Sequence, residues 1–267
     1  MISRYICVLH ILARNPHISL IGNPNSGKSS VFNHLTGLRQ KVGNFPGVTV
    51  EKKSGVCRLS NKQDITVIDL PGAYSLYPRR SDEWVSYKQL MSPVEGEQVD
   101  LAVVVVDATA LRRNLLFVSQ VIDLKIPVVV ALTMTDLAKK RGLHINTREL
   151  SREMQVPVVS VNARTGKGIE ELKATISQVL LNSFTAKDFF SVGSLAEGPI
   201  SEARAVLPNK SDYAIVHYLI NHEQFDVSND IQDRIEQIEK KYGFNHTKIQ
   251  AEDIQQRYKR IREIIKK

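Results

Sequence analysis

The sequence predicts an α/β domain with a mostly parallel sheet, followed by a small all-α domain. Short apolar runs alternate with helical patterns from residue 17 to about residue 182, which is the order of elements in a parallel sheet. These runs are almost continuous in Val and Ile, as expected for strands that are covered on both faces. From about residue 199 onward the patterns are helical, and no strand pattern follows.

The individual elements of the first domain follow from these runs. The expected strands are Ile18–Ile21, Ile65–Asp69, Leu101–Val106 (ending at Asp107), Pro127–Leu132 and Pro157–Val161. The expected helices are Ser30–Leu35 (closed by Gly37), Trp84–Leu90, Leu111–Leu124, Thr147–Met154 and Ile169–Leu181. Because ligands bind at the carboxyl ends of the strands in such sheets, we expect the functional site there.

The second half of the chain divides at a change of composition. Residues 183–198 are expected to form a connector or an irregular helix, and residues 199–267 a helical domain. Its expected helices are Asp212–Asn221, one marked by Ile231, Ile235 and Ile238, and Ala251–Lys267. The first domain is assigned to residues 17–182. Residues 1–16 are a leader for which a strand, a short helix and disorder all remain open.

Bulk composition excludes several classes of protein. The 267 residues are 42% hydrophobic and 24% charged, which is ordinary for a globular protein. No run approaches the roughly 18 apolar residues of a membrane span. There are two cysteines, without a C-x-x-C pair. The sequence therefore indicates neither a disulfide framework nor a metal site, and a reducing compartment is favoured. The seven histidines show no metal-ligand spacing. The net charge of +8 allows a nucleic-acid or membrane-surface partner.

One segment carries most of the functional information. It is the phosphate-binding loop at residues 22–29, which fits the pattern G-x-x-x-x-G-K-[ST] between an expected strand and an expected helix. In such a loop the backbone N–H groups converge on phosphate oxygens, the lysine reaches the outer phosphates, and the final hydroxyl binds Mg²⁺. The helix N-terminus adds a favourable field for an anion.

Two further segments fit a nucleotide site. Asp69-Leu70-Pro71-Gly72 follows a strand, so that a carboxylate is expected near Mg²⁺ and the Gly72 N–H near a terminal phosphate. The segment 42–50 contains two glycines, a proline and Thr49, which offers a hydroxyl for Mg²⁺. We predict a mobile loop there, with a hairpin loop as the alternative interpretation.

Base recognition is expected at the next strand end, where nucleotide switches commonly present N-x-x-D. This chain has Thr133-Met134-Thr135-Asp136. Asp136 can accept the two donors of guanine, which adenine lacks, whereas Thr133 cannot reproduce the simultaneous donor and acceptor groups of an amide. The loss of one hydrogen bond predicts binding weaker by up to about tenfold. In the later segment 160–164, Asn162 stands where serine is usual.

Together these segments resemble the amino-terminal cytosolic region of the ferrous-iron transport protein B (FeoB) family. The resemblance covers residues 17 to 267 and rests on G-N-P-N-S-G-K-S at 22–29, V-G-N-F-P-G-V-T-V-E-K-K at 42–53, D-L-P-G-A-Y-S-L at 69–76, V-V-D-A-T-x-L-x-R-N-L at 105–115 and N-A-R-T-G-K-G at 162–168. It implies a GTPase domain followed by a helical domain, on the cytoplasmic face of a bacterial membrane, acting on a transmembrane domain that this chain does not contain.

The resemblance also implies roles for single residues. Lys28, Thr49 and Gly72 would act in hydrolysis; Ser29 and Thr49 would bind Mg²⁺, with Asp69 acting through its water shell, and Asn25 would help to bind K⁺. Asp136 and the Ala163 N–H would bind guanine. The full set expected at GTP or GDP is Gly22, Asn23, Pro24, Asn25, Ser26, Gly27, Lys28, Ser29, Ser30, Thr133, Asp136, Asn162, Ala163 and Arg164.

The residue after the D-x-x-G segment limits the expected rate of GTP hydrolysis. Ala73 follows the D-x-x-G segment, where some GTPases carry a glutamine that positions water, and an alanine cannot do so. We therefore expect slow GTP hydrolysis, with water held by the backbone of the 42–50 loop, and stimulation by K⁺. Alternatives are a soluble GTPase that acts on RNA, and a nucleotide-binding module with degenerate base recognition. Basic residues are spread along the chain, so nucleic acid is not an expected partner, and oligomerisation remains open.

Overall fold

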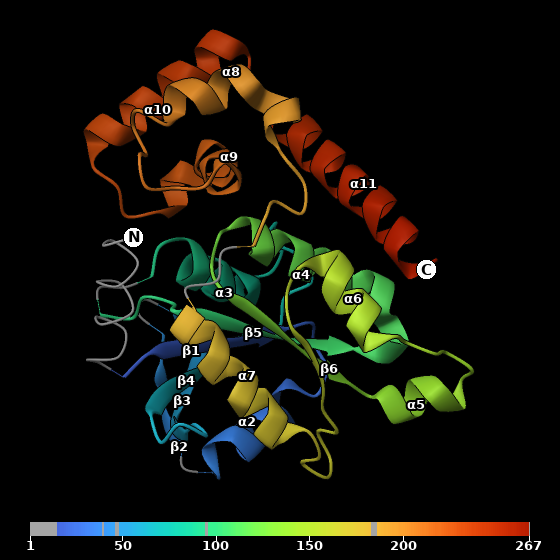
Figure 1. The fold of residues 1–267 in the computed structure, drawn as a ribbon. Coiled ribbons are helices and arrows are strands. Elements are labelled where there is room, and N and C mark those ends of the chain that lie inside the picture. The colour runs from blue at the N-terminus through green and yellow to red at the C-terminus, as the bar shows by residue number, and fades with distance from the viewer. Residues whose placement is uncertain (1–14, 39, 46–47, 94–95, 183–185, 267) are drawn as a thin grey trace.

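A seven-stranded sheet forms the centre of the molecule (Figure 1). The computed structural model describes residues 15–38, 40–45, 48–93, 96–182 and 186–266, so residues 1–14 of the expected leader lie outside the described residues. The strands lie in the order β2-β3-β4-β1-β5-β6-β7. Their bounds are β1 (His17–Gly22), β2 (Gln40–Asn44), β3 (Glu51–Arg58), β4 (Asp64–Asp69), β5 (Leu101–Asp107), β6 (Val128–Thr133) and β7 (Val158–Ser160).

Pairing confirms the predicted, mostly parallel sheet. β1 pairs in parallel with β4 and β5, and β5, β6 and β7 continue in parallel, whereas β3 pairs antiparallel with both β2 and β4. The register places Gly22 opposite Val105, and Asp107 opposite Thr133. The carboxyl ends of the central strands therefore meet at one edge of the sheet.

Helices cover both faces of the sheet. α2 (Lys28–Thr36) and α7 (Ile169–Asn182) lie on one face; α3 (Ser81–Met91), α4 (Leu111–Asp123) and α6 (Thr147–Met154) lie toward the other (Figure 1). The apolar runs of the central strands are almost wholly buried between these layers. All the strands and helices predicted for the first domain are present, with ends that differ by a few residues.

For the segment 42–50 the alternative interpretation, a hairpin loop, is confirmed in the described residues, and residues 42–44 belong to a strand rather than to a loop. β2 and β3 form an antiparallel hairpin in which Asn44 pairs with Glu51, and the Phe45 N–H donates to the Val50 carbonyl at 3.0 Å. Residues 46–47 lie outside the described part of the chain. The hairpin carries few apolar residues, and β3 is buried only at alternate positions near its end. It therefore lacked the continuous apolar run that marked the other strands.

Two helices differ from the sequence expectations. α5 (Thr135–Lys140) is a six-residue helix after β6, and it was not predicted. α8 (Gly193–Ala203) begins inside the segment expected to be a connector or an irregular helix. It contains Pro199 and a break in helical geometry at Ala196. These interruptions explain why its sequence showed no clean helical period.

The remaining helices form a layer above α3 and α4 (Figure 1). They are α9 (Asp212–Asn221), α10 (Asn229–Tyr242) and α11 (His246–Ile265), with a 3₁₀ turn at His222–Gln224 after α9. Another 3₁₀ turn, Ala108–Ala110, joins β5 to α4 in the first domain. Ser211 and Asn245 cap α9 and α11 by accepting backbone N–H groups. Within the described residues, no helix combines the length and the apolarity that crossing a bilayer requires.

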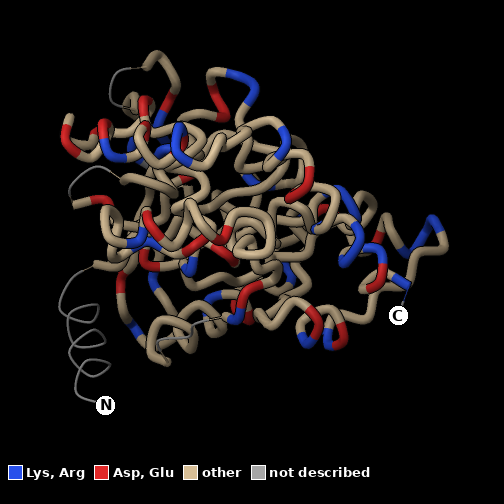
Figure 2. The backbone as a smooth tube through the Cα atoms, turned by 90° about the horizontal axis from the view of Figure 1, so that it is seen from above, with Lys and Arg blue, Asp and Glu red and all other residues tan. Residues whose placement is uncertain are grey.

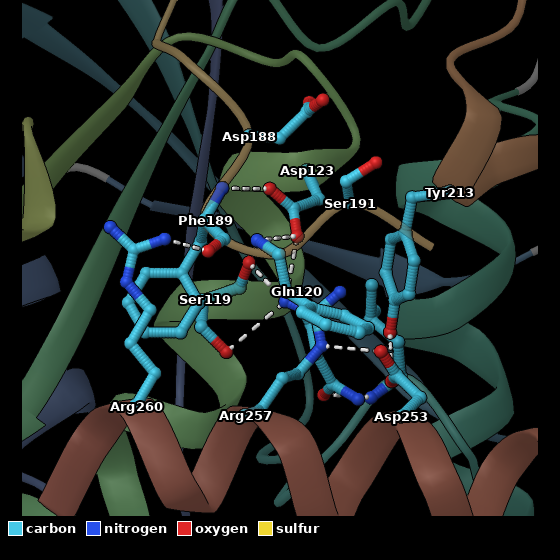
Figure 3. Close-up of polar contacts among 12 residues, drawn as sticks. Ser119, Gln120, Asp123, Asp188, Phe189, Ser191, Tyr213, Asp253, Arg257 and Arg260 are labelled. Carbon is cyan, nitrogen blue, oxygen red and sulfur yellow. Dashed lines mark hydrogen bonds and ion pairs between the residues drawn. The ribbon is translucent and has the colours of Figure 1, made fainter. Parts of the chain in front are cut away.

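A buried guanidinium joins this helical layer to α4 (Figure 3). Arg257 on α11 is fully buried, and its Nε donates to Asp253 Oδ1 at 2.8 Å. Its Nη1 lies 2.7 Å from Asp123 Oδ2 and donates to the Ser119 carbonyl at 2.8 Å. Asp123 also accepts the Phe189 N–H at 2.6 Å. One carboxylate thus links α4, α11 and the segment between the two domains.

The charges of this junction depend on one another. Burial raises the pKa of Asp123, and Arg257 acts in the opposite sense. Burial alone would lower the pKa of Arg257, but Tyr213, Asp253 and Asp123 raise it above its ordinary value. Arg257 is therefore a permanent cation in the core. Removing one partner of a buried ion pair typically costs about 3–5 kcal/mol, so the junction fixes how the helices sit on α4.

An aromatic cluster beside this junction reaches the segment that follows β4. The Tyr77 hydroxyl donates to Asp253 Oδ2 at 3.0 Å, and the Tyr213 hydroxyl donates to the same oxygen at 3.2 Å. His217 on α9 stacks on Tyr77 with ring centroids 4.9 Å apart and meets Tyr213 edge-on at 4.6 Å. The chain just after the D-x-x-G segment is thereby attached to the helical layer at Tyr77.

His217 should make the folded protein sensitive to acid. Burial lowers its pKa to about 3, whereas an unfolded chain has a histidine pKa of about 6.5. Below about pH 6.5 the unfolded chain binds a proton at this histidine and the folded chain does not. The free energy of unfolding therefore decreases as the pH is lowered from about 6.5 to about 3. Between pH 7 and pH 5 we expect the wild type to lose about 2 kcal/mol more than His217→Gln in urea unfolding.

The matched control for this experiment is His144→Gln, because His144 is exposed. This variant should keep the pH dependence of the wild type. An identical pH dependence for wild type and His217→Gln would contradict the prediction.

Candidate nucleotide site

The chain between β1 and α2 forms a tight loop at the carboxyl edge of the sheet. β1 ends at Gly22 and α2 begins at Lys28. Asn25, with φ of 63°, and Gly27, with φ of 87°, adopt left-handed conformations, and the Ser26 N–H donates to the Asn23 carbonyl at 3.2 Å. This path brings the free N–H groups of the first turn of α2 next to the loop, where they favour an anion.

Two polar side chains of this loop are buried without a protein partner. Asn23 and Ser26 are 2% and 1% exposed. Asn23 Nδ2 and Ser26 Oγ form no hydrogen bond with any described residue. Buried polar groups are usually paired, so these two atoms indicate that the loop is built to meet polar atoms from outside the protein.

Close packing explains two of the glycines. A Cβ added at Gly22 would lie 2.4 Å from the carbonyl oxygen of Val105 in β5. A Cβ added at Gly72 would lie 2.9 Å from the backbone nitrogen of Pro24. The Ala73 N–H donates to the Gly22 carbonyl at 3.1 Å. The D-x-x-G segment is therefore held directly against the phosphate-binding loop.

Lys28 and Asp69 form an ion pair where the D-x-x-G segment meets the phosphate-binding loop. The Lys28 ammonium donates a charge-assisted hydrogen bond to Asp69 Oδ1, and both side chains are largely buried. Ser29 and Ser30, on the next positions of α2, are exposed. The loop and the start of α2 thus bring together a cation and two hydroxyls, and the ion pair with Lys28 adds a carboxylate from the end of β4. Acid and hydroxyl oxygens are the ligands that Mg²⁺ prefers.

Thr49 is not brought into this cluster. It is exposed in the turn between β2 and β3, and it makes no hydrogen bond with another described residue. Its role as a ligand of Mg²⁺ stays a prediction. Asn25 is likewise exposed, at the outer surface of the loop.

The strand end expected to recognise the base separates Thr133 from Asp136. Thr133 is fully buried, and its hydroxyl lies 2.7 Å from the Ser26 carbonyl oxygen. Asp136 is exposed in the first turn of α5. The two residues therefore face different surroundings, and only Asp136 presents its polar atoms outward.

The loop after β7 completes this side of the site. Asn162 Oδ1 accepts the N–H groups of Arg164 at 3.0 Å and Thr165 at 3.1 Å, which holds the turn that presents Ala163. A Cβ added at Gly27 would lie 3.3 Å from the Ala163 Cβ. Asn162 thus organises the loop where a serine was expected, and Arg164 is exposed beside it.

Sequence reasoning missed one contact that positions this loop. His34 on α2 hydrogen-bonds through Nε2 to the Ala163 carbonyl at 3.1 Å. A Cβ added at Gly166 would lie 3.0 Å from the His34 ring, so the glycine leaves room for it. A histidine at the end of a helix carries no signal of this kind without the fold.

Positive charge is not gathered around the site alone. Lys and Arg lie among Asp and Glu along most of the tube in Figure 2. The net charge of +8 is therefore an average over a mixed surface.

The family model described as "Ferrous iron transport protein B" matches residues 16–176. The chain belongs to this family. The Fe(2+) transporter FeoB of Leptospira biflexa is 43% identical over 165 residues, which are 62% of this chain and 23% of that protein. The Fe(2+) transporter FeoB of Escherichia coli K12 is 44% identical over 165 residues, again 62% of this chain and 21% of that protein. The chain thus spans about a fifth of the length of these curated relatives.

Solved structures extend the likeness over the helical layer. The cytosolic domain of the T. maritima FeoB iron transporter in its apo form is 28% identical with a TM-score of 0.78, covering 95% of this chain and 99% of that one. A GDP-bound variant of the S. thermophilus FeoB G-domain is 34% identical with a TM-score of 0.74, covering 94% and 98%. The α/β domain followed by helices is thus the shared fold of these family members.

The glycine at the end of β1 should tolerate no side chain. We expect Gly22→Ala to lower the free energy of unfolding by about 1–3 kcal/mol, since its Cβ would overlap the β5 backbone. Chemical denaturation measures this. The control is Gly43→Ala in β2, where nothing lies within 4 Å of an added Cβ. Equal stability of the two variants would show that the close approach is absent.

Proposed function

We propose that this chain is a switch domain that binds guanine nucleotides and slowly hydrolyses GTP to GDP and phosphate. The observation that carries the proposal is the convergence of Lys28, Asp69 and Gly72 on the phosphate-binding loop. Relatives support it, because T. maritima FeoB cytosolic domains are described in GDP and GMPPNP forms. Their fold is that of this chain.

The loop supplies the groups that a triphosphate requires. Backbone N–H groups from Gly22 to Ser30 would surround the phosphates, and Lys28 would exchange its Asp69 partner for β- and γ-phosphate oxygens. The Gly72 N–H would meet the terminal phosphate, and the lack of a side chain at Gly72 lets this segment lie against Pro24 of the loop.

The residues present also fit Mg²⁺. Asp69 and the hydroxyls of Ser29 and Thr49 would hold it, Asp69 through water. When bound, Mg²⁺ neutralises charge on the β- and γ-phosphates.

Hydrolysis should be slow because none of the described side chains after the D-x-x-G segment is poised to orient water. Ala73 is buried and carries only a methyl group. Water would be held by backbone groups of the 42–50 segment. Asn25, exposed on the loop, would help to hold K⁺ beside the phosphates, where a monovalent cation stabilises developing charge.

Guanine would be recognised by the outward carboxylate of Asp136 and by the Ala163 N–H. Asn162 and Arg164 shape the loop that presents this N–H. Asp136 accepts both guanine donors, and adenine has none to match.

The biological role we propose is regulation of Fe(II) uptake. The segments 42–50 and 72–80 would respond to the γ-phosphate, and the Tyr77–Asp253 contact would carry the change to the helical domain. We assign the GTPase domain to residues 17–182, a connector to 183–198 and the helical domain to 199–267. The helical domain would act on a transmembrane domain of the full-length protein, at the cytoplasmic face of the membrane.

Lys28→Ala should lower kcat/KM for GTP by roughly 10²-fold, because the mutation removes a preorganised cation from the phosphates. Phosphate release with Mg·GTP measures the effect, and Mg·ATP should be a poor substrate for the wild type. The control is Lys88→Ala, on the exposed side of α3. Iron uptake by cells that carry the full-length protein should fall with the same mutation. Undiminished GTP turnover by Lys28→Ala would overturn the proposed function.

Hydrolysis by the wild type should be faster in KCl than in NaCl at equal concentration, and Asn25→Ala should abolish the difference. The asparagine has an exposed amide that can bind an ion, whereas alanine has none. Choline chloride provides the baseline without a bound ion. Equal rates in all three salts would remove K⁺ from the mechanism and leave the nucleotide site intact.

A further inference from the structure

Thr133 occupies a position that its motif does not explain. It is the last residue of β6 and is fully buried. Its Oγ1 lies 2.7 Å from the Ser26 carbonyl oxygen and 3.1 Å from the Val106 carbonyl oxygen. Ser26 lies in the phosphate-binding loop, and Val106 lies in β5. The hydroxyl therefore sits between the loop and the strand beside it.

A hydroxyl has a single hydrogen, so it can donate fully to only one of these two carbonyls. The shorter distance selects Ser26. The methyl group of Thr133 lies 3.9 Å from a Cβ built at Gly27, the residue that follows Ser26. The hydroxyl of Thr133 thus bonds the phosphate-binding loop, and its methyl group lies close to Gly27, the last residue of the loop before α2.

This geometry leaves Thr133 no polar atom for a base. Its only donor is engaged inside the protein, and its side chain has no exposed surface. Asp136, three residues later, is exposed. The two functions that an asparagine could combine at this strand end, holding the loop and contacting the base, are separated in this chain.

We propose that Thr133 is a positioning residue for the phosphate-binding loop and takes no part in choosing the base. This inference rests on the proposed nucleotide site. The Ser26 carbonyl, held by the hydroxyl, fixes the loop just before Gly27 and Lys28, so the bond preorganises the N–H groups that meet phosphate. Affinity for phosphates then depends on Thr133, whereas preference for guanine depends on Asp136.

The experiment compares ligands with and without a base. Dissociation constants for Mg·GDP, Mg·IDP and Mg·pyrophosphate are measured by displacement of a fluorescent GDP analogue. Thr133→Val keeps the shape and removes the donor, which leaves the buried Ser26 carbonyl unpaired. We expect affinity to fall by roughly tenfold for all three ligands alike. Thr133→Ser keeps the hydroxyl and should stay within about twofold of the wild type.

Asp136→Asn provides the opposite pattern. It should weaken GDP binding, narrow the preference for GDP over IDP, and leave pyrophosphate unchanged. Thr133→Val should keep the wild-type ratio of GDP to IDP affinity. Should Thr133→Val fail to fold, as judged by thermal melting, Thr133→Ala removes the same donor with a smaller side chain and takes its place.

Three results are decisive. A loss of GDP affinity without loss of pyrophosphate affinity would assign Thr133 to the base and overturn the proposal. Unchanged affinity for every ligand would also overturn it, because the hydrogen bond to Ser26 would then contribute nothing to phosphate binding. If the wild type itself binds neither GDP nor pyrophosphate, the proposed function fails.

Discussion

The close packing of one loop against the ends of its neighbouring strands is the constraint on which the site depends. The β5 backbone approaches Gly22 so closely that no Cβ fits, and Pro24 leaves no room for a Cβ at Gly72 either. Thr133 holds the Ser26 carbonyl from a third direction. The contacts come from β5, from the segment that follows β4 and from the end of β6, so the geometry of the loop is inherited from the register of the strands. An anion-binding site of fixed shape needs such support.

A second, independent constraint lies on the far side of α4. Arg257 connects α11 to α4 through Asp123, and Asp253 on the same helix accepts the Tyr77 hydroxyl. Since Tyr77 lies five residues after Gly72, the segment that packs against the phosphate-binding loop at Gly72 continues into contact with the helical layer. The Leu76 N–H also donates to a side chain of α4 at 2.9 Å. A shift of this segment must therefore disturb packed groups in both layers.

The sequence predicted the elements whose burial leaves a pattern. Continuous apolar runs located β1 and the strands beside it, and the loop spacing located Lys28. The β2–β3 hairpin was predicted only as an alternative, because many of its residues are exposed and its apolar residues form no continuous run. The junction at Arg257 was missed because Asp123 and Arg257 are far apart in sequence, and a charged residue on a helix usually lies in solvent. Thr133 was recognised as a departure from a motif. Its hydrogen bond to Ser26 depends on how the end of β6 lies against the phosphate-binding loop, which no local sequence pattern encodes.

The burial of Arg257 has a consequence for solution conditions. Mobile ions screen charges that water surrounds, and the Debye length at physiological ionic strength is about 8 Å. The pair between Arg204 and Asp212 is exposed and is open to this screening. Arg257 and Asp123 are buried, so counter-ions cannot enter between them. The attachment of the helices to α4 should therefore persist in concentrated salt that weakens the ion pairs on the surface.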